Sequence, residues 1–315
     1  MDFNIIKKGL LGTVFAMPLL AFSASAADQS APAETNAPAT TTIDGGVNAD
    51  PALYKISDED TNIYVLGTIH VLPEDYRWFD GEIKTAFEAS DELVLEVVAP
   101  APDVMQGIVM ELAVDPEGKT VRSYFDEDMK TQYESRLTSL GIPAESFDVF
   151  EPWMVSVTLS AIQISSMGLN PEVGVESVLT AAAEASDKPI NGLETAAQQL
   201  GFFDDLSKQA QLDMLESGIE DWDEAPDMLN TMLSTWSQGD ISGLADLLNE
   251  EMSAQEELQR VLLTARNVRW AEWVKTRLDT PGTVFMAVGA GHIAGEGSLF
   301  DVLNDDGIQA VRLSK

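Results

Sequence analysis

Two short segments near opposite ends of the chain share one pattern, and they constrain the fold more than any other feature. Each is an apolar, β-rich run that ends in glycine, and a histidine follows three positions after that glycine: residues 63–70 read IYVLGTIH and residues 284–292 read VFMAVGAGH. His70 and His292 are the only histidines in the 315 residues. By chance, two unrelated histidines would both have this glycine about one time in two hundred, a figure weakened because the strands are chosen afterwards. We predict that two strands bring the histidines to one site.

The first 26 residues have the pattern of a secretory signal peptide. Lys7 and Lys8 precede an uncharged run over residues 9–24, and Ala-Ser-Ala stands at 24–26. The alternative is an uncleaved membrane anchor, but the run is short for a span of about 20 apolar residues and Pro18 interrupts it. With no cysteine, the chain has neither a lipid-modified cysteine nor a disulfide. We predict cleavage near Ala26, no stable membrane anchoring afterwards, and a periplasmic or secreted bacterial protein.

The charge limits the partners. The formal net charge of -35 repels phosphate backbones and anionic membrane surfaces, so we expect no nucleic-acid partner. A salty habitat or cationic partners would also explain this acidic protein, although a well-solvated surface is the simpler interpretation. Residues 27–50 are rich in Ala, Thr and Pro without periodicity, which predicts a disordered linker. The folded domain is then predicted over residues 51–315.

The order of the predicted elements favours an α/β fold, or an α+β fold, with a central mixed or parallel sheet and a large helical middle region. Strands are predicted at residues 53–56, 63–66, 92–97, 188–192, 283–288 and 310–313, the first two as a hairpin. Helices are predicted at residues 80–87, 126–140, 152–167, 172–185, 196–218, 225–238, 241–248, 255–278 and 298–304. The apolar rather than alternating strand at 92–97 indicates a parallel, buried sheet. We predict a sheet built from N- and C-terminal strands, with a helical insert over about residues 126–278.

A histidine just past a strand lies where open α/β sheets bind ligands, at the carboxyl ends of the strands. Neutral imidazole suits a transition metal, and without cysteine any metal site must be completed by carboxylate, water or backbone oxygen. The best-placed carboxylate is Glu96, at the end of a strand that we expect to neighbour the first one. Glu176 and Glu194 come next. Taken singly, each glutamate is more simply a solvated surface charge and each histidine a structural residue, whereas the matched histidine pair favours function.

The long helix predicted near the C-terminus carries Arg266 and Asn267. By default these are ordinary helix-surface residues, but basic groups are scarce here, so an arginine that holds an anion is worth considering. Trp270 and Trp273 are predicted to lie in the core. The sequence contains no His-Glu-x-x-His zinc helix, no Gly-x-Ser-x-Gly elbow and no phosphate-binding glycine loop.

Six segments together resemble the TraB/GumN family, which is related to the Tiki metalloproteases and more distantly to erythromycin esterase-like proteins. In order they read YVLGTIH (64–70), LE (95–96), GVE (174–176), GLET (192–195), RN (266–267) and VGAGH (288–292). The resemblance extends over about residues 52–313. Because several motifs occur in the right order, it is specific for family membership and much less specific for activity.

The resemblance implies an α/β fold in which the two Gly-x-x-His segments meet, and peptide hydrolysis that depends on Mn²⁺ or Co²⁺, as in Tiki proteins. His70 and His292 match the motif histidines and Glu96 matches the acidic residue, which makes these three the implied ligands of a divalent metal (Mn, Co or Zn). The implied mechanism is attack on a carbonyl by metal-activated water, with one glutamate as ligand or general base. The candidates for catalysis are Glu96 and the residues at further motif positions, Glu176, Glu194, Arg266 and Asn267. Arg266 would hold a substrate carboxylate or the developing oxyanion.

Three functions stay open at this point. The leading one is a metal-dependent, metalloprotease-like hydrolase of a peptide or small-molecule substrate, with His70, His292 and at least one glutamate in a single metal sphere. The second is a non-catalytic ligand- or metal-binding protein, with a closed coordination sphere. The third is a metal-independent, esterase-like hydrolase with one histidine as general base, which requires a buried histidine–carboxylate pair. The sequence determines neither the substrate nor the oligomeric state.

Overall fold

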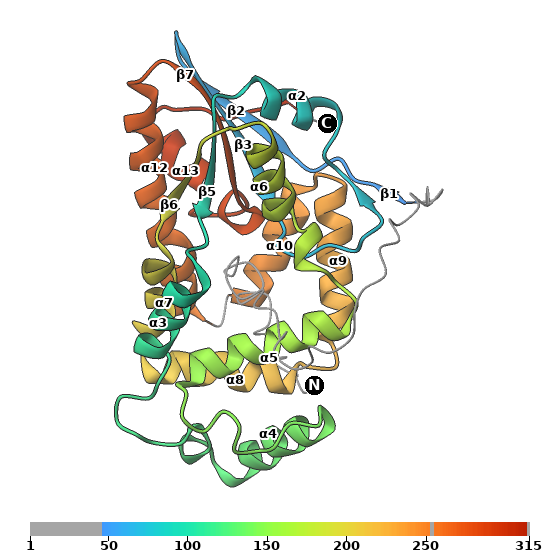
Figure 1. The fold of residues 1–315 in the computed structure, drawn as a ribbon, viewed down its shortest axis with the longest axis vertical. Helices are drawn as coiled ribbons and strands as arrows, with labels where there is room; N and C mark the ends of the chain where they lie inside the picture. The colour runs from blue at the N-terminus through green and yellow to red at the C-terminus, as the bar shows by residue number, and fades with distance from the viewer. Residues whose placement is uncertain (1–45, 253–254, 314–315) are drawn as a thin grey trace, which may run out of the picture.

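A computed structural model describes residues 46–252 and 255–313 (Figure 1). The predicted signal peptide and residues 27–45 of the predicted linker lie outside the described residues. The last residues of the predicted linker belong to the fold, because β1 (Val47–Asn48) pairs in parallel with β4 (Tyr76–Arg77). Ala49 is buried, and its backbone N–H donates to the carbonyl of Arg77. The ordered chain therefore starts before Pro51.

The centre of the molecule is a mixed six-stranded sheet with the strand order β6-β5-β7-β3-β2-β8. Its strands are β2 (Leu53–Ser57), β3 (Thr61–Thr68), β5 (Glu92–Val97), β6 (Ile190–Glu194), β7 (Gly282–Gly289) and β8 (Val311–Arg312). The four strands β3, β7, β5 and β6 are parallel, whereas β2 runs antiparallel to both β3 and β8. This confirms the predicted α/β class, the β2–β3 hairpin and a sheet made from strands near both ends of the chain.

One detail of the strand order differs from the prediction. The strand that carries Glu96 does not neighbour the first strand, because β7 lies between β5 and β3. Thr68 of β3 pairs with Gly289, and Leu95 of β5 pairs with Ala287. Residues 284–288 are fully buried, and an apolar strand of this kind suits the centre of a parallel sheet covered on both faces.

Helices cover both faces of this sheet, and more helices form a separate helical lobe (Figure 1). The helices are α2 (Gly81–Ala89), α3 (Pro102–Leu112), α4 (Glu127–Ser139), α5 (Pro152–Ser166), α6 (Val175–Ala185), α7 (Ala196–Asp204), α8 (Lys208–Glu220), α9 (Ala225–Ser237), α10 (Ile241–Met252), α11 (Glu256–Gln259), α12 (Ala265–Leu278) and α13 (Leu299–Asp305). One face of the sheet packs against α2, α6, α9 and α10, and the other packs against α12 and α13. Within the described residues, no helix combines the length and the apolar character needed to cross a membrane.

The helical lobe contains α3, α4, α5, α7 and α8, and it lies against the carboxyl end of the sheet. Val97, the last residue of β5, and Ala196, which follows β6, both pack into its apolar core with Trp153 and Phe203. Helix α3 was not predicted from the sequence. The helical lobe therefore borders the edge at which the predicted site residues emerge.

Two long helices predicted from the sequence are each interrupted. The predicted helix over residues 196–218 is two helices, because Ser207 caps α8 by accepting a hydrogen bond from the backbone of Ala210. The predicted helix over residues 255–278 contains a π-helical segment, Arg260–Thr264, directly before α12. A π segment widens the helix by one residue per turn and often lies at functional sites.

Candidate functional site

The two Gly-x-x-His segments lie side by side at the carboxyl edge of the sheet. They follow the adjacent parallel strands β3 and β7, in which Thr68 pairs with Gly289. A Cβ on Gly67 would lie 2.7 Å from the Ile293 side chain and 3.2 Å from the Ala290 Cα. Glycine at position 67 therefore allows the first segment to pack directly on the second.

His70 pairs with a carboxylate. Its Nδ1 lies 2.7 Å from Oε1 of Glu176, and the Thr68 hydroxyl donates a hydrogen bond to the same oxygen. The side chains of His70 and Glu176 are only 7% and 14% exposed. Glu176 lies in the first turn of α6, where a carboxylate also interacts favourably with the helix dipole.

The backbone of the Gly-Val-Glu motif explains how α6 reaches His70. A Cβ on Gly174 would lie 2.0 Å from the carbonyl oxygen of His70, so no other residue fits here without a shift of the backbone. The next backbone N–H, that of Val175, donates to the carbonyl of Ile69 at 3.2 Å. Glycine thus permits a close contact that directs Glu176 at the imidazole.

The ionisation of Glu176 follows from these contacts. Burial by itself would raise the pKa of this carboxyl. The charge of His70 and the hydrogen bonds from His70, Thr68 and the backbone outweigh burial, and together they lower the pKa of Glu176 below its ordinary value. Glu176 is therefore an anion at neutral pH, and it holds Nδ1 of His70 in the protonated form.

His292 has different surroundings, because it contacts the buried guanidinium of Arg266. Arg266 lies on α12 and is fully buried. Its Nε and Nη2 donate to Glu194 at 3.0 and 2.8 Å, and Nη2 also donates to Oε2 of Glu96 at 2.6 Å. Its Nη1 donates to the Leu262 carbonyl at 3.1 Å and contacts Nε2 of His292 at 3.0 Å. All five N–H groups of the guanidinium therefore have an acceptor.

The two glutamates in this network have further partners. The backbone N–H of Gly289 donates to Oε1 of Glu96 at 2.7 Å, and the Gln199 amide donates to Oε2 at 3.1 Å. The Trp270 indole donates to Oε1 of Glu194 at 3.1 Å. Thr68, Gln199 and Trp270 were not predicted as site residues. Of these, only Thr68 stood within a quoted motif, as the residue after Gly67.

The contacts of His292 fix its tautomer. The Asn267 amide nitrogen donates to the Gly297 carbonyl at 2.8 Å, so the Asn267 oxygen faces Nδ1 of His292 at 2.7 Å. Nδ1 therefore carries the proton and donates to Asn267, and Nε2 accepts from Arg266. Burial, followed by the positive charges of Arg266 and His70, holds the pKa of His292 well below its ordinary value. This imidazole is neutral at pH 7.

The predicted site residues therefore form two groups at one edge of the sheet. The first is His70 with Glu176. The second, which we call the Arg266 network, contains Glu96, Glu194, Arg266, Asn267 and His292. His292 and Glu96 approach each other, with Nε2 of His292 3.7 Å from Oε1 of Glu96.

The fit of a divalent metal can be tested on these contacts. In residues 46–252 and 255–313, no group of three or more His, Asp or Glu side chains is placed to hold a metal ion. The resemblance implies His292 and Glu96 as ligands in the Arg266 network. Nε2 of His292 and Oε2 of Glu96 accept hydrogen bonds from Arg266, and Oε1 of Glu96 accepts one from the backbone N–H of Gly289. In this arrangement the residues do not fit a metal, because these ligand atoms already accept hydrogen bonds from Arg266 and Gly289. The predicted metal cofactor stays a prediction.

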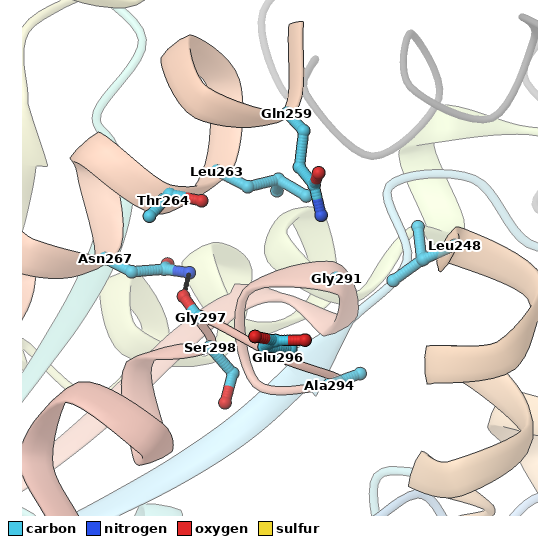
Figure 2. Close-up of a pocket in the computed structure, with 10 residues that line it drawn as sticks. All are labelled: Leu248, Gln259, Leu263, Thr264, Asn267, Gly291, Ala294, Glu296, Gly297 and Ser298. Atoms are coloured by element: carbon cyan, nitrogen blue, oxygen red, sulfur yellow. Dashed lines mark hydrogen bonds between the residues drawn. The ribbon is translucent and has the colours of Figure 1, made fainter. Parts of the chain in front are cut away.

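A shallow pocket adjoins the far side of the Arg266 network. It lies between the π-helical segment and the loop after β7, and Figure 2 shows the Asn267 amide at its wall with the hydrogen bond to Gly297. The lining combines apolar side chains, such as Leu248 and Leu263, with the Glu296 carboxylate. Asn267 thus lies at this pocket and also contacts His292.

Comparison with known proteins gives the family. The sequence model of the TraB/PrgY/gumN family matches residues 52–312. The chain is 25% identical over 242 residues to "Uncharacterized protein YbaP" of Escherichia coli (strain K12), which covers 77% of this chain and 88% of the relative. An uncharacterized protein of Treponema pallidum (strain Nichols) is 23% identical over 268 residues, 79% of each chain. No solved structure matches.

Proposed function

We propose that this chain, which belongs to the TraB/PrgY/gumN family, is a hydrolase of peptide, amide or ester bonds that uses His70 and Glu176 as its acid–base pair. The observation that supports this most is the 2.7 Å contact between Nδ1 of His70 and Glu176 at the carboxyl edge of the sheet. A buried imidazole oriented by a carboxylate is the usual arrangement of a general base. Cleavage of peptide bonds in particular rests on the family resemblance.

The chemistry follows from the tautomer of His70. With its Nδ1–H donated to Glu176, a neutral His70 has its lone pair on Nε2 and can take a proton from a water that attacks the scissile carbonyl. The Glu176 anion stabilises the imidazolium that forms, and the proton then passes from Nε2 to the leaving group. General acid–base catalysis of this kind contributes about 10²–10⁴-fold to a rate.

The Arg266 network has a positioning role in this proposal. The sequence suggested that Arg266 binds a substrate carboxylate or an oxyanion, but its N–H groups are occupied by protein acceptors. Through Glu96, Glu194 and His292, the guanidinium connects the ends of β5, β6 and β7. It therefore supports the edge from which His70 acts.

The test measures hydrolysis by the purified protein. The probes are fluorescent casein, a defined peptide mixture read by mass spectrometry, and p-nitrophenyl butyrate. We expect His70→Gln and Glu176→Gln each to lower kcat/KM by about 10²–10⁴-fold. Glu184→Gln, an exposed position on the same helix, is the matched control and should keep full activity. Equal activity in all three variants would contradict the proposal.

Chelation distinguishes this proposal from the metal-dependent alternative. Activity that survives prolonged treatment with EDTA supports the pair of His70 and Glu176 acting without a metal. Activity that is lost and then restored by Mn²⁺, Co²⁺ or Zn²⁺ would instead favour a metal held by His70, His292 and Glu96. Absence of turnover for every probe, with and without these ions, would leave the non-catalytic binding protein as the better explanation.

We also propose that the protein acts in the periplasm or is secreted. The support is the signal-peptide pattern of residues 1–26. Recovery of the protein from the periplasmic fraction with an N-terminus at Ala27 would agree with this location. An intact N-terminus in the cytoplasmic fraction would contradict it.

A further inference from the structure

We propose that Arg266 is the built-in cation of this site, and that its guanidinium fills the position between Glu96, Glu194 and His292 that a divalent metal would otherwise take. This inference concerns the Arg266 network alone. It does not rest on the proposed role of His70 and Glu176.

The charges of the network require a cation at this position. The side chains of Glu96 and Glu194 are 1% and 4% exposed, and a buried carboxylate is costly unless it is paired and hydrogen-bonded. Among the described residues, Arg266 is the only buried Lys or Arg. Arg269 also approaches Glu194, at 3.6 Å, but its side chain is about half exposed. The buried counter-charge for both glutamates therefore comes from Arg266.

The geometry is specific for a guanidinium. Nε and Nη2 form a two-pronged contact with the Glu194 carboxylate, which fixes the plane of the group. In that plane, Nη1 lies between the Leu262 carbonyl and Nε2 of His292. A lysine ammonium is a point charge with three donors and cannot make this set of contacts.

The protein also prepares the acceptors for this cation. Asn267 keeps the proton of neutral His292 on Nδ1, which turns the Nε2 lone pair toward Arg266. Gly289 and Gln199 bind the Glu96 carboxylate, and Trp270 binds that of Glu194. The carboxylates and imidazole that would be metal ligands are thus held around a guanidinium.

The wild-type protein and an Arg266 variant should differ in metal binding. The wild-type protein should not bind a divalent ion at this position, because Arg266 occupies it. Replacement by methionine keeps the apolar bulk and removes the charge, so Arg266→Met should leave two carboxylates and a neutral imidazole facing one gap. Carboxylate oxygens and imidazole nitrogens are suitable ligands for Zn²⁺.

The experiment measures metal content and the melting temperature with and without Zn²⁺, for the wild type, Arg266→Met and the double variant Arg266→Met with His292→Gln. We expect no metal and no shift for the wild type. Arg266→Met should melt at a lower temperature and bind one Zn²⁺ per chain, and Zn²⁺ at about a hundred times its dissociation constant should raise its melting temperature by about 5–10 °C. In the double variant, Zn²⁺ should no longer raise the melting temperature.

Arg122→Met is the matched control. Arg122 also joins two carboxylates, those of Asp148 and Glu134, but it is partly exposed and has no histidine partner. In Arg122→Met, Zn²⁺ should not raise the melting temperature. Comparing Arg266→Met with Arg122→Met distinguishes specific Zn²⁺ binding at the position of Arg266 from a general effect of Zn²⁺ on acidic surfaces.

Two results would overturn the inference. One is near-stoichiometric metal in the wild type that is lost in both His292→Gln and Glu96→Gln, because Arg266 would then give way to a metal. The other is an Arg266→Met protein that folds but shows no response to Zn²⁺. If that variant folds only when Zn²⁺ is present, the inference is supported. If it does not fold with or without Zn²⁺, the metal content of the wild type is the test: no bound metal supports the inference, and near-stoichiometric metal contradicts it. None of these measurements uses hydrolysis, so they stand apart from the proposed function.

Discussion

The two histidines follow the same sequence pattern and lie at the same edge of the sheet, yet their surroundings are opposite in charge. His70 faces the anion Glu176 and is slightly exposed, whereas His292 faces the cation Arg266 and is fully buried. The carboxylate favours a protonated imidazole and the guanidinium favours a neutral one. A repeated motif can therefore place two identical side chains at one edge of a sheet while their neighbours give them different chemistry.

The largest effect is expected when the cation beside His292 is removed. Arg266→Met leaves Glu96 and Glu194 buried without their counter-charge, which should lower the free energy of unfolding by about 3–5 kcal/mol. Urea unfolding of this variant beside Arg122→Met measures the effect. Because Arg122 is partly exposed, its loss should cost about 1 kcal/mol or less. Equal losses in the free energy of unfolding would mean that the buried Arg266 network stabilises the fold no more than the partly exposed ion pairs of Arg122.

The next prediction concerns the backbone that sets the surroundings of His70. Gly174→Ala places a Cβ against the His70 carbonyl and should lower the free energy of unfolding by about 1–3 kcal/mol as α6 shifts. Glu176 moves with α6, so hydrolysis should fall as well. Gly107→Ala on α3 is the control, since no atom lies near the added methyl, and it should stabilise by about 0.5–1 kcal/mol. A fully stable Gly174→Ala protein would refute the tight contact.

The smallest predicted effect is a pH dependence that belongs to His292 alone. Its pKa is lowered in the folded state, so below about pH 6.5 the unfolded chain binds a proton that the folded chain refuses. Stability should therefore fall as pH falls below about 6.5, by up to about 1.4 kcal/mol per pH unit, until the pH reaches the pKa of His292 in the folded state. The stabilisation from Glu176, whose pKa is lowered, is complete above its unfolded pKa and is lost only as pH falls further, through its folded pKa.

Urea unfolding across this pH range, on the wild type and His292→Asn, measures the slope. We expect the variant to be less stable at pH 7 and to lack the part of the slope that His292 contributes. His70→Gln should keep that part. An unchanged slope in His292→Asn would show that the second imidazole is not held neutral, and the contrast between the two histidines would disappear.

Much of the fold could be predicted from the sequence, because local patterns carry it. Apolar runs marked β3, β5 and β7, and glycine or capping residues marked many helix ends. The strand order could not be predicted, since β5 and β7 are both apolar enough for a central position and only packing of the whole sheet decides between them. The break before α8 was missed because residues 196–218 have one continuous helical pattern, and the capping role of Ser207 within it was not recognised.

The position of the candidate site at the edge of the sheet could be predicted, but the contacts between its side chains could not. The carboxyl edge of the sheet, with both histidines and Glu96, could be predicted because each histidine follows an apolar strand and Glu96 lies near the end of another. That one guanidinium would serve both Glu96 and Glu194 depends on the rotation of α12, which is fixed by the burial of Trp270 and Val274 against the sheet. No local pattern reports that rotation. Arg266 was therefore a candidate from its position in a motif, whereas its partners could not be predicted.

The central position of β7 has a consequence for how the chain folds. β7 is made near the C-terminus, yet it pairs with β3 on one side and β5 on the other. Until it arrives, both neighbouring strands have an unpaired edge in the middle of the sheet, and pairing over such a long sequence separation is slow. The sheet and both histidine environments therefore form only once nearly the whole chain has been synthesised.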